Sequence, residues 1–402
     1  MDRRELKRVS QRLEVFTSEL FDSFVRREQL SWGRKYLGGL MLDGRRKSIQ
    51  PMAERLGEHD HQGLSQFVNQ STWAVEPVRE ALAVRMFAEL DPELLVIDDV
   101  GFPKQGRDSV GVARMYSGAL GKVGNCQIGV SLTIATDTAS CPVNWRLFLP
   151  ESWDADTERR TKCGVPAEVR HVPKWQLALD QIDDLIEWGL EVPTVAADTA
   201  YGDVTDFRLA LEQRGLSYVV QVKPTTTARA LDEVPRSAEY GGRGQPPKAQ
   251  YELPLSSLAE LAANADPDAW ERLTYRTTAA DRELTSRFLV MQIRPANRKI
   301  PRTELRELPP AVMVCEWPSG DENPARYWLS NLPADTAPES LARLAKLRWR
   351  IEQDYRELKH GLGLDHFEGR SWRGWQHHVT LASVAHAFLT IERRDPKVPA
   401  PA

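Results

Sequence analysis

The sequence predicts an α/β fold, and three features of the chain point to it. Two apolar runs, residues 93–97 and 192–197, each end in aspartate followed by a turn that contains glycine. Such runs are typical of buried strands with acidic groups at their carboxyl ends. Segments with helical periodicity lie before and after the second run. Strands that alternate with helices favour a sheet covered by helices.

Composition fits a soluble globular protein of two or three domains, because the chain has 402 residues, of which 41% are hydrophobic and 27% charged. The net charge of −4 argues against a generally basic nucleic-acid-binding surface. DNA binding would therefore depend on local basic patches, at residues 45–47, at 346–350, and at Arg370 with Arg373. A solvated charged face is the alternative for each patch.

Four cysteines, without metal-ligand spacing or a dense disulfide pattern, favour a reducing cytoplasm. Neither a signal peptide nor an apolar stretch of about 18 residues is found, so no membrane association is expected. His366, His377 and His378 lack further ligands at zinc-site spacing, and we expect them to be structural or to face DNA.

Carboxylates follow both predicted strands. Asp98 and Asp99 end the first strand, and adjacent strand residues face opposite ways, so only one of them can point into a given site. Asp198 ends the second strand. A turn or helix-cap role is the alternative for each aspartate. Residues 130–135 and 145–149 alternate like further strands, so the first acid would open a three-stranded meander.

A long helix is predicted near the C-terminal end of the chain. Thr336 and Glu339 have capping-box spacing, Pro338 is tolerated in the first turn, and Gly361 supplies the stop. One face of this helix carries Glu352 among groups that can bind phosphate or pair with it, at helical spacing: Arg348, Tyr355, Arg356 and Lys359.

Together the acids suggest metal-dependent phosphodiester chemistry. If the two strands are neighbours and Glu352 lies across from them, Asp98, Asp198 and Glu352 form an oxygen-rich site suited to Mg²⁺ or Mn²⁺. The alternative for Glu352 is a solvated charge stripe, in which it pairs with Arg348 or Arg356.

The amino-terminal part, about residues 1 to 88, is predicted to be helical. Residues 47–57 could open a helix-turn-helix-like unit that reads DNA. A small helical cap that packs on the core is the alternative. Further helices are expected at 175–186 and 203–215, and a strand at 217–222.

The chain, over about residues 35 to 390, resembles the DDE transposases of bacterial insertion sequences that have a β-rich insertion, most closely those of the insertion-sequence 701 kind. Residues 98–104, residues 118–127 and the helix around Glu352 carry the resemblance. The superfamily signature Y-x2-R-x3-E-x6-K is matched at Arg348, Glu352 and Lys359, whereas Ala345 stands where the tyrosine would be.

What the resemblance implies is a ribonuclease-H-like mixed sheet flanked by helices. It assigns the catalytic triad to Asp98 or Asp99, then Asp198, then Glu352, and we prefer Asp98. Val100 stands where relatives commonly have a threonine, so Asp99 remains a candidate for the first catalytic acid. The metal ligands would be Asp98, Asp198 and Glu352, with Mg²⁺ as the cofactor and Mn²⁺ able to substitute. Expected DNA contacts are Arg348, Lys359, Arg356, Tyr355, Trp328, Lys104 and Lys122.

The domain layout follows from the long gap before Glu352, which implies an inserted subdomain. We expect a helical domain at 1–88, the first part of the catalytic core at 89–223, a β-rich insertion at 224–326, the second part of the core at 327–392, and a flexible tail at 393–402. Trp328 lies near where some relatives place an aromatic ring that stacks on a displaced base, although a buried core tryptophan is the alternative.

The function that the resemblance implies is a DNA transposase that cuts and joins the ends of its element by two-metal-ion hydrolysis and strand transfer. Its partners would be double-stranded DNA with terminal inverted repeats, target DNA, and a second copy of the chain as a homodimer on DNA. The alternatives are a catalytically silent DNA-binding or regulatory protein, and a ribonuclease-H-like nuclease without strand transfer.

Overall fold

The computed structural model describes residues 3–57, 61–118, 121–233, 235–236, 242–244, 250–278, 280–303 and 307–394. The chain forms two compact units. Unit 1 contains Met1–Glu93, Ile97–Glu191 and Trp349–Ala402, and unit 2 contains Leu94–Val96 and Val192–Arg348. The predicted insertion, 224–326, lies wholly inside unit 2 together with the segments on either side of it.

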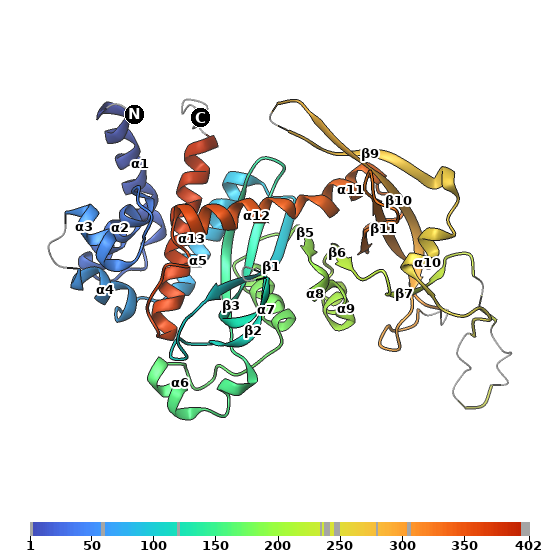
Figure 1. The fold of residues 1–402 in the computed structure, drawn as a ribbon, viewed down its shortest axis with the longest axis horizontal. Helices are drawn as coiled ribbons and strands as arrows, with labels where there is room; N and C mark the ends of the chain where they lie inside the picture. The colour runs from blue at the N-terminus through green and yellow to red at the C-terminus, as the bar shows by residue number, and fades with distance from the viewer. Residues whose placement is uncertain are drawn as a thin grey trace. The chain divides into compact units, whose positions relative to one another are not determined.

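Unit 1 begins with five helices, as predicted for the amino-terminal part, although the fifth runs two residues beyond residue 88. These helices are α1 (Arg3–Leu20), α2 (Arg27–Met41), α3 (Ile49–Leu56), α4 (Gln62–Asn69) and α5 (Val75–Leu90). The long helix α13 (Trp372–Arg394) packs against α2, α4 and α5 (Figure 1). Its buried residues cover most of its circumference, as expected for a helix surrounded by other elements.

The sheet of unit 1 contains the predicted meander and one additional strand. β1 (Leu94–Pro103) neighbours β3 (Lys122–Ala135), which pairs antiparallel with β4 (Ser140–Phe148) and with β2 (Ala113–Ser117). Helix α7 (Lys174–Glu187) packs on β3 and β4, and so lies on the sheet as predicted. Leu185 of α7 is buried, whereas Ile186 is exposed. Unit 1 also contains η1 (Glu151–Trp153), α6 (Thr157–Cys163), α12 (Trp349–Arg356) and the π-helix η3 (Glu357–Gly361).

The strands of unit 2 follow the order β5-β6-β12-β11-β10-β7-β8, and β9 pairs with β10. β5 and β6 are parallel, and the other pairs for which a register is known are antiparallel. The strands are β5 (Thr194–Ala197), β6 (Tyr218–Val222), β7 (Thr227–Ala230), β8 (Ser256–Ser257), β9 (Trp270–Thr277), β10 (Glu283–Pro295), β11 (Ala311–Trp317) and β12 (Arg326–Ser330). The helices are α8 (Thr199–Gly202), α9 (Thr205–Gln213), α10 (Leu258–Ala263), η2 (Pro267–Ala269) and α11 (Pro338–Leu347).

The predicted α/β class, mixed sheet and flanking helices are confirmed. The long C-terminal helix was predicted as one element but is divided at Arg348 into α11 and α12. Its predicted capping box is wrong, because Ala337 is the N-cap residue and Pro338 occupies the first turn. The last part of the helix widens into the π-helix, which ends at Gly361 as predicted. No helix among the described residues has both the length and the apolar character needed to cross a membrane.

Candidate active site

The two adjacent aspartates of β1 face different helices of unit 1. The carboxylate of Asp99 forms an ion pair with Lys174, the first residue of α7. Burial lowers the pKa of Lys359 in the π-helix, and the nearby negative charges of Asp365 and, to a smaller extent, Asp98 oppose this shift. Adjacent strand residues face opposite ways, so the two acids lie on different sides of β1.

Helix α12 and the π-helix that follows it contact the strands of unit 1 through Tyr355, Lys359 and Arg350. The Tyr355 hydroxyl oxygen lies 2.5 Å from Ser131 Oγ, and the Ser131 hydroxyl also donates to the carbonyl oxygen of Asp98 at 3.4 Å. Lys359 Nζ donates to the carbonyl oxygen of Gly101 at 3.3 Å. Near the start of the helix, Arg350 donates to two carbonyls of the β3–β4 turn, at 3.0 and 2.9 Å. Contacts on both sides of Glu352 in sequence thus fix this helix.

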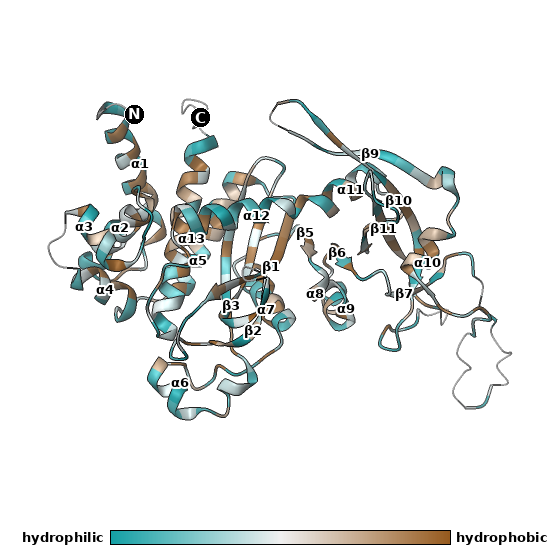
Figure 2. Ribbon diagram, in the orientation of Figure 1, coloured by the Kyte–Doolittle hydropathy of each residue, from teal (hydrophilic) through white to brown (hydrophobic). Residues whose placement is uncertain are grey.

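Glu352 itself is exposed and lies in the first turn of α12. Residues three positions apart share a face of an α-helix, so Glu352 is on the side of α12 that carries Tyr355. Figure 2 shows α12 mostly in teal, the colour of hydrophilic residues. Its buried residues are Ile351 and Asp354. The helix therefore presents a polar face that is anchored at Tyr355 and accessible at Glu352.

Asp198 belongs to unit 2, where it follows β5 directly. One of its carboxylate oxygens accepts a hydrogen bond from the backbone N–H of Ala200 at 2.9 Å, so Asp198 is the N-cap residue of α8. The helix-cap role left open by the sequence is therefore real. A side chain fixed by such a bond points in a defined direction, which is also what a metal ligand requires.

The arrangement and the chemistry of the predicted metal ligands both bear on metal binding. In the described part of the chain, no three His, Cys, Asp or Glu side chains come together as a group able to hold a metal ion. The chemistry of the predicted donors does fit a hard divalent cation, because Asp98, Asp198 and Glu352 offer carboxylate oxygens and none of these residues is fully buried.

The family of the protein follows from its sequence, since residues 19–286 match the family model of the DDE superfamily endonucleases. The chain belongs to this family. It is also similar to a probable transposase for insertion sequence element IS701 from Microchaete diplosiphon, at 28% identity over 195 residues. That alignment covers 47% of this chain and 48% of the relative, so the chain spans about half the length of the curated relative it matches.

The residues that were predicted to contact DNA differ in their accessibility. Lys122 and Arg356 are exposed. Lys104 is partly buried, donates from Nζ to the carbonyl oxygen of Phe367 at 2.7 Å, and has its pKa lowered by burial. Trp328 is only 4% exposed, in β12. For Trp328 the expectation of base stacking is corrected, because the ring is packed into the core of unit 2.

Of three further residues that were predicted to contact DNA, two form hydrogen bonds within the protein. Tyr355 and Lys359 make the contacts with β3 and β1 described above. Arg348 follows α11 as its C-cap residue, and unit 2 ends with it. Ala345, at the position of the signature tyrosine, is 6% exposed and packs in the apolar face of α11.

His366, His377 and His378 all bind within the protein. His378 is buried, with Nδ1 2.9 Å from the Tyr36 hydroxyl and Nε2 3.1 Å from the carbonyl oxygen of Leu364. Both ring nitrogens of His377 face backbone carbonyls, at 2.9 and 3.0 Å, and Nδ1 of His366 accepts from the backbone N–H of Lys47 at 3.1 Å. A neutral His377 ring can donate to only one of its two carbonyls. Burial nevertheless dominates and lowers the pKa of His377 to about 4.

The amino-terminal helices pack as a cap on α13. Helix α4 buries Leu64, Phe67 and Val68, contacts α13, and carries no lysine or arginine. Lys47 is buried and donates to the carbonyl of Leu42. These contacts are those of the helical cap that the sequence left as an alternative, and the DNA-reading role of this segment stays a prediction.

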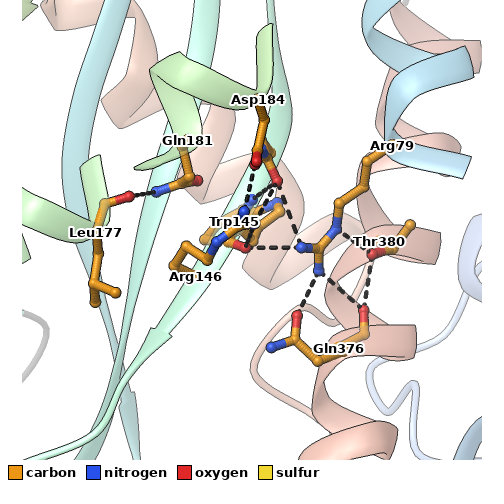
Figure 3. A network of polar contacts seen from close by, with 9 residues as sticks. Arg79, Trp145, Arg146, Leu177, Gln181, Asp184, Gln376 and Thr380 are labelled. Atoms are coloured by element: carbon orange, nitrogen blue, oxygen red, sulfur yellow. Dashed lines mark hydrogen bonds and ion pairs between the residues drawn. The ribbon is translucent and has the colours of Figure 1, made fainter. Parts of the chain in front are cut away.

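One polar network was not predicted from the sequence (Figure 3). Arg79 of α5 is 2% exposed and donates to Thr380 Oγ1 at 2.8 Å, to the Trp145 carbonyl at 2.8 Å and to Gln376 Oε1 at 2.7 Å. It thereby joins α5, β4 and α13. The sequence contained one sign of this network, an arginine between Val78 and Leu82 in the apolar stripe of α5.

Proposed function

We propose that this DDE endonuclease is a DNA transposase that cuts and joins the ends of an insertion sequence. Asp98, Asp198 and Glu352 would be its catalytic carboxylates and would hold Mg²⁺, for which Mn²⁺ can substitute. The observation that carries the proposal is the anchoring of the Glu352 helix beside Asp98, through the Tyr355–Ser131 contact and the Lys359–Gly101 bond. Family membership supports the same chemistry.

The proposal assigns roles to the chain's own residues. Divalent cations, when bound, activate a water or 3′-hydroxyl nucleophile and stabilise the leaving oxygen. Arg348 and Arg356 would grip phosphates of the DNA end through their planar guanidinium groups. Lys359 would orient the π-helix on β1 while it adds positive charge near Asp98, because it is near both the Gly101 carbonyl and that carboxylate.

Asp98 rather than Asp99 is proposed as the first acid. Asp99 is engaged by Lys174 of α7, whereas the charge of Asp98 acts on Lys359 of the π-helix that continues from α12. The partners follow from the reaction: double-stranded DNA with terminal inverted repeats, target DNA, and a second copy of the chain, since two ends must be joined together.

The test is Mg²⁺-dependent cleavage and joining of duplex DNA that carries the element's own ends. The native protein is compared with Glu352→Gln and with a matched control, Glu339→Gln, which removes an exposed first-turn carboxylate from α11. We expect the native protein and the control to cut and join, and Glu352→Gln to bind without cutting.

Other outcomes would identify the alternatives. Cutting without joining would make the protein a nuclease that lacks strand transfer. Binding without cleavage by the native protein, with Mg²⁺ or Mn²⁺, would favour a catalytically silent DNA-binding protein. Equal activity of native protein and Glu352→Gln would contradict the proposed site.

A further inference from the structure

A cavity of about 820 Å³ lies beside strand β4 in unit 1. Its walls come from β4, α6, α7 and the starts of α5 and α13. In the described part of the chain, β4 pairs with β3 alone, so its other edge is free of strands. None of Asp98, Asp198 and Glu352 lines the cavity, which is therefore distinct from the candidate active site.

The cavity is lined by more basic than acidic side chains, whereas the whole chain has a negative net charge. Three acidic side chains line it, Glu76, Glu168 and Asp180, against five basic ones. The lining residues thus carry an excess of two positive charges, although Asp184 and Asp108, just outside the lining, pair with Arg146 and Lys162, and the chain as a whole has a net charge of −4. The basic residues are Arg79, Arg146, Lys162, Arg170 and Arg373.

Arg79 contributes a positive charge that its hydrogen-bond partners do not cancel. Its partners, the Thr380 hydroxyl, the Trp145 carbonyl and the Gln376 amide, are neutral acceptors (Figure 3). Burial lowers the pKa of Arg79 to about 9, so the group stays protonated at neutral pH. Arg146, by contrast, has an ion pair with Asp184.

Exposed cations surround this buried charge. Lys162, Arg170 and Arg373 are exposed, and so can reach a ligand that is too large to enter the cavity. Lys162 lies 3.7 Å from Asp108 in an exposed ion pair, and Arg373 donates to the carbonyl oxygen of Gln70 at 3.2 Å; surface contacts of this kind are weak enough for a phosphate to replace. Helices α5, α7 and α13 all begin at the cavity wall or next to it, and the positive ends of helix dipoles add to the same field. Flexible cations around a positive hollow are suited to a row of phosphates.

We propose that this cavity and its rim bind phosphodiester groups of DNA outside the catalytic carboxylates. The inference rests on the proposed function in one respect, that the protein acts on DNA. It assigns the contact to Lys162, Arg170 and Arg373, with Arg79 as a fixed charge behind them. Contacts of this kind position a duplex and carry no base sequence information.

The experiment is metal-free binding of duplex DNA over a series of salt concentrations, so that it does not depend on catalysis. The test variant is Lys162→Gln, Arg170→Gln and Arg373→Gln together. The matched control is Arg4→Gln, Lys7→Gln and Arg8→Gln on α1, which removes the same charge from other exposed positions of unit 1. Circular dichroism and Tm of each variant establish folding.

We expect the affinity of the test variant to fall by roughly tenfold or more, and the salt slope to shrink by about 0.9 for each DNA phosphate that the protein no longer neutralises. The control should change both far less. Glu168→Gln should act in the opposite direction and tighten binding, because it removes an acidic group from the rim. If the triple variant unfolds, Arg170→Gln alone serves, since its side chain is exposed.

Equal losses in the test and control variants would show an effect of overall charge and overturn the site. Unchanged duplex binding in the test variant would also overturn it. Tripolyphosphate serves as a second probe: loss of its binding with duplex binding intact would assign the cavity to a free polyphosphate instead of DNA. Normal binding by Glu352→Gln without cleavage would leave this site standing even if the proposed chemistry failed.

Discussion

The hydroxyl oxygen of Tyr355 lies 2.5 Å from Ser131 Oγ, and Ser131 in turn donates to the backbone carbonyl of Asp98. This contact joins α12 to β3 immediately beside the first candidate acid. Tyr355, which the sequence suggested as a DNA contact, is therefore better placed to position the Glu352 helix.

Tyr355→Phe removes only the hydroxyl and should lower the rate of DNA cleavage by about tenfold, because a shifted helix misplaces its carboxylate. DNA affinity and Tm should change little. The measurement is single-turnover cleavage beside equilibrium binding. Ser131→Ala should give a similar loss, and the double variant should be no worse than either single variant. A weakened DNA affinity with normal cleavage would instead restore the DNA-contact role.

The two aspartates of β1 can be separated by substitution. Asp98→Asn should abolish cleavage. Asp99→Asn should leave measurable cleavage but lower the free energy of unfolding, since Lys174 loses its carboxylate partner. Lys174→Met is the control for the loss of that ion pair. Abolished cleavage in Asp99→Asn with full activity in Asp98→Asn would reverse the assignment.

Arg79→Leu should destabilise unit 1 by about 3 kcal/mol, because it leaves Gln376, Thr380 and the Trp145 carbonyl without their buried donor. Denaturant unfolding measures the change. Arg85→Leu is a control on the same helix, where the arginine pairs with carboxylates at the surface and should matter little. A loss below about 0.5 kcal/mol for Arg79→Leu would contradict the structural role of this network.

His378 should make folding less stable in acid. Its partners fit a neutral ring, with Nε2–H donating to Leu364 and Nδ1 accepting from Tyr36, and burial lowers its pKa to about 4. The unfolded chain takes up the proton near pH 6.5, so stability is full above that pH and falls between about pH 6.5 and 4. Unfolding free energies measured across this range should fall less steeply in His378→Gln. An identical pH dependence in the two proteins would show that His378 does not contribute.

Gly202→Ala should destabilise unit 2, because a Cβ at this position would lie 1.9 Å from the backbone oxygen of Gln221. The backbone of β6 and the Asp198 turn would have to separate. Gly106→Ala, with no atom within 4 Å of its Cβ, is the matched control in unit 1. Thermal unfolding followed by circular dichroism distinguishes them, and equal Tm values would show that the loop adjusts at no cost.

The sequence by itself determined the features that depend on local pattern. Apolar runs that end in aspartate located β1 and β5, and helical periodicity located α7, α9 and the helix of Glu352. Periodicity reports local backbone geometry, which neighbouring residues along the chain determine.

Only the tertiary structure decided which other elements each side chain contacts. The sequence pattern does not distinguish Asp98 from Asp99. Their neighbours in the fold do, because Asp99 pairs with Lys174 of α7, whereas the charge of Asp98 acts on Lys359 of the π-helix. The break at Arg348 and the burial of Trp328 and Arg79 likewise depend on contacts between segments far apart in the chain. Such contacts leave no periodic signal, because the partners are brought together by folding and not by spacing.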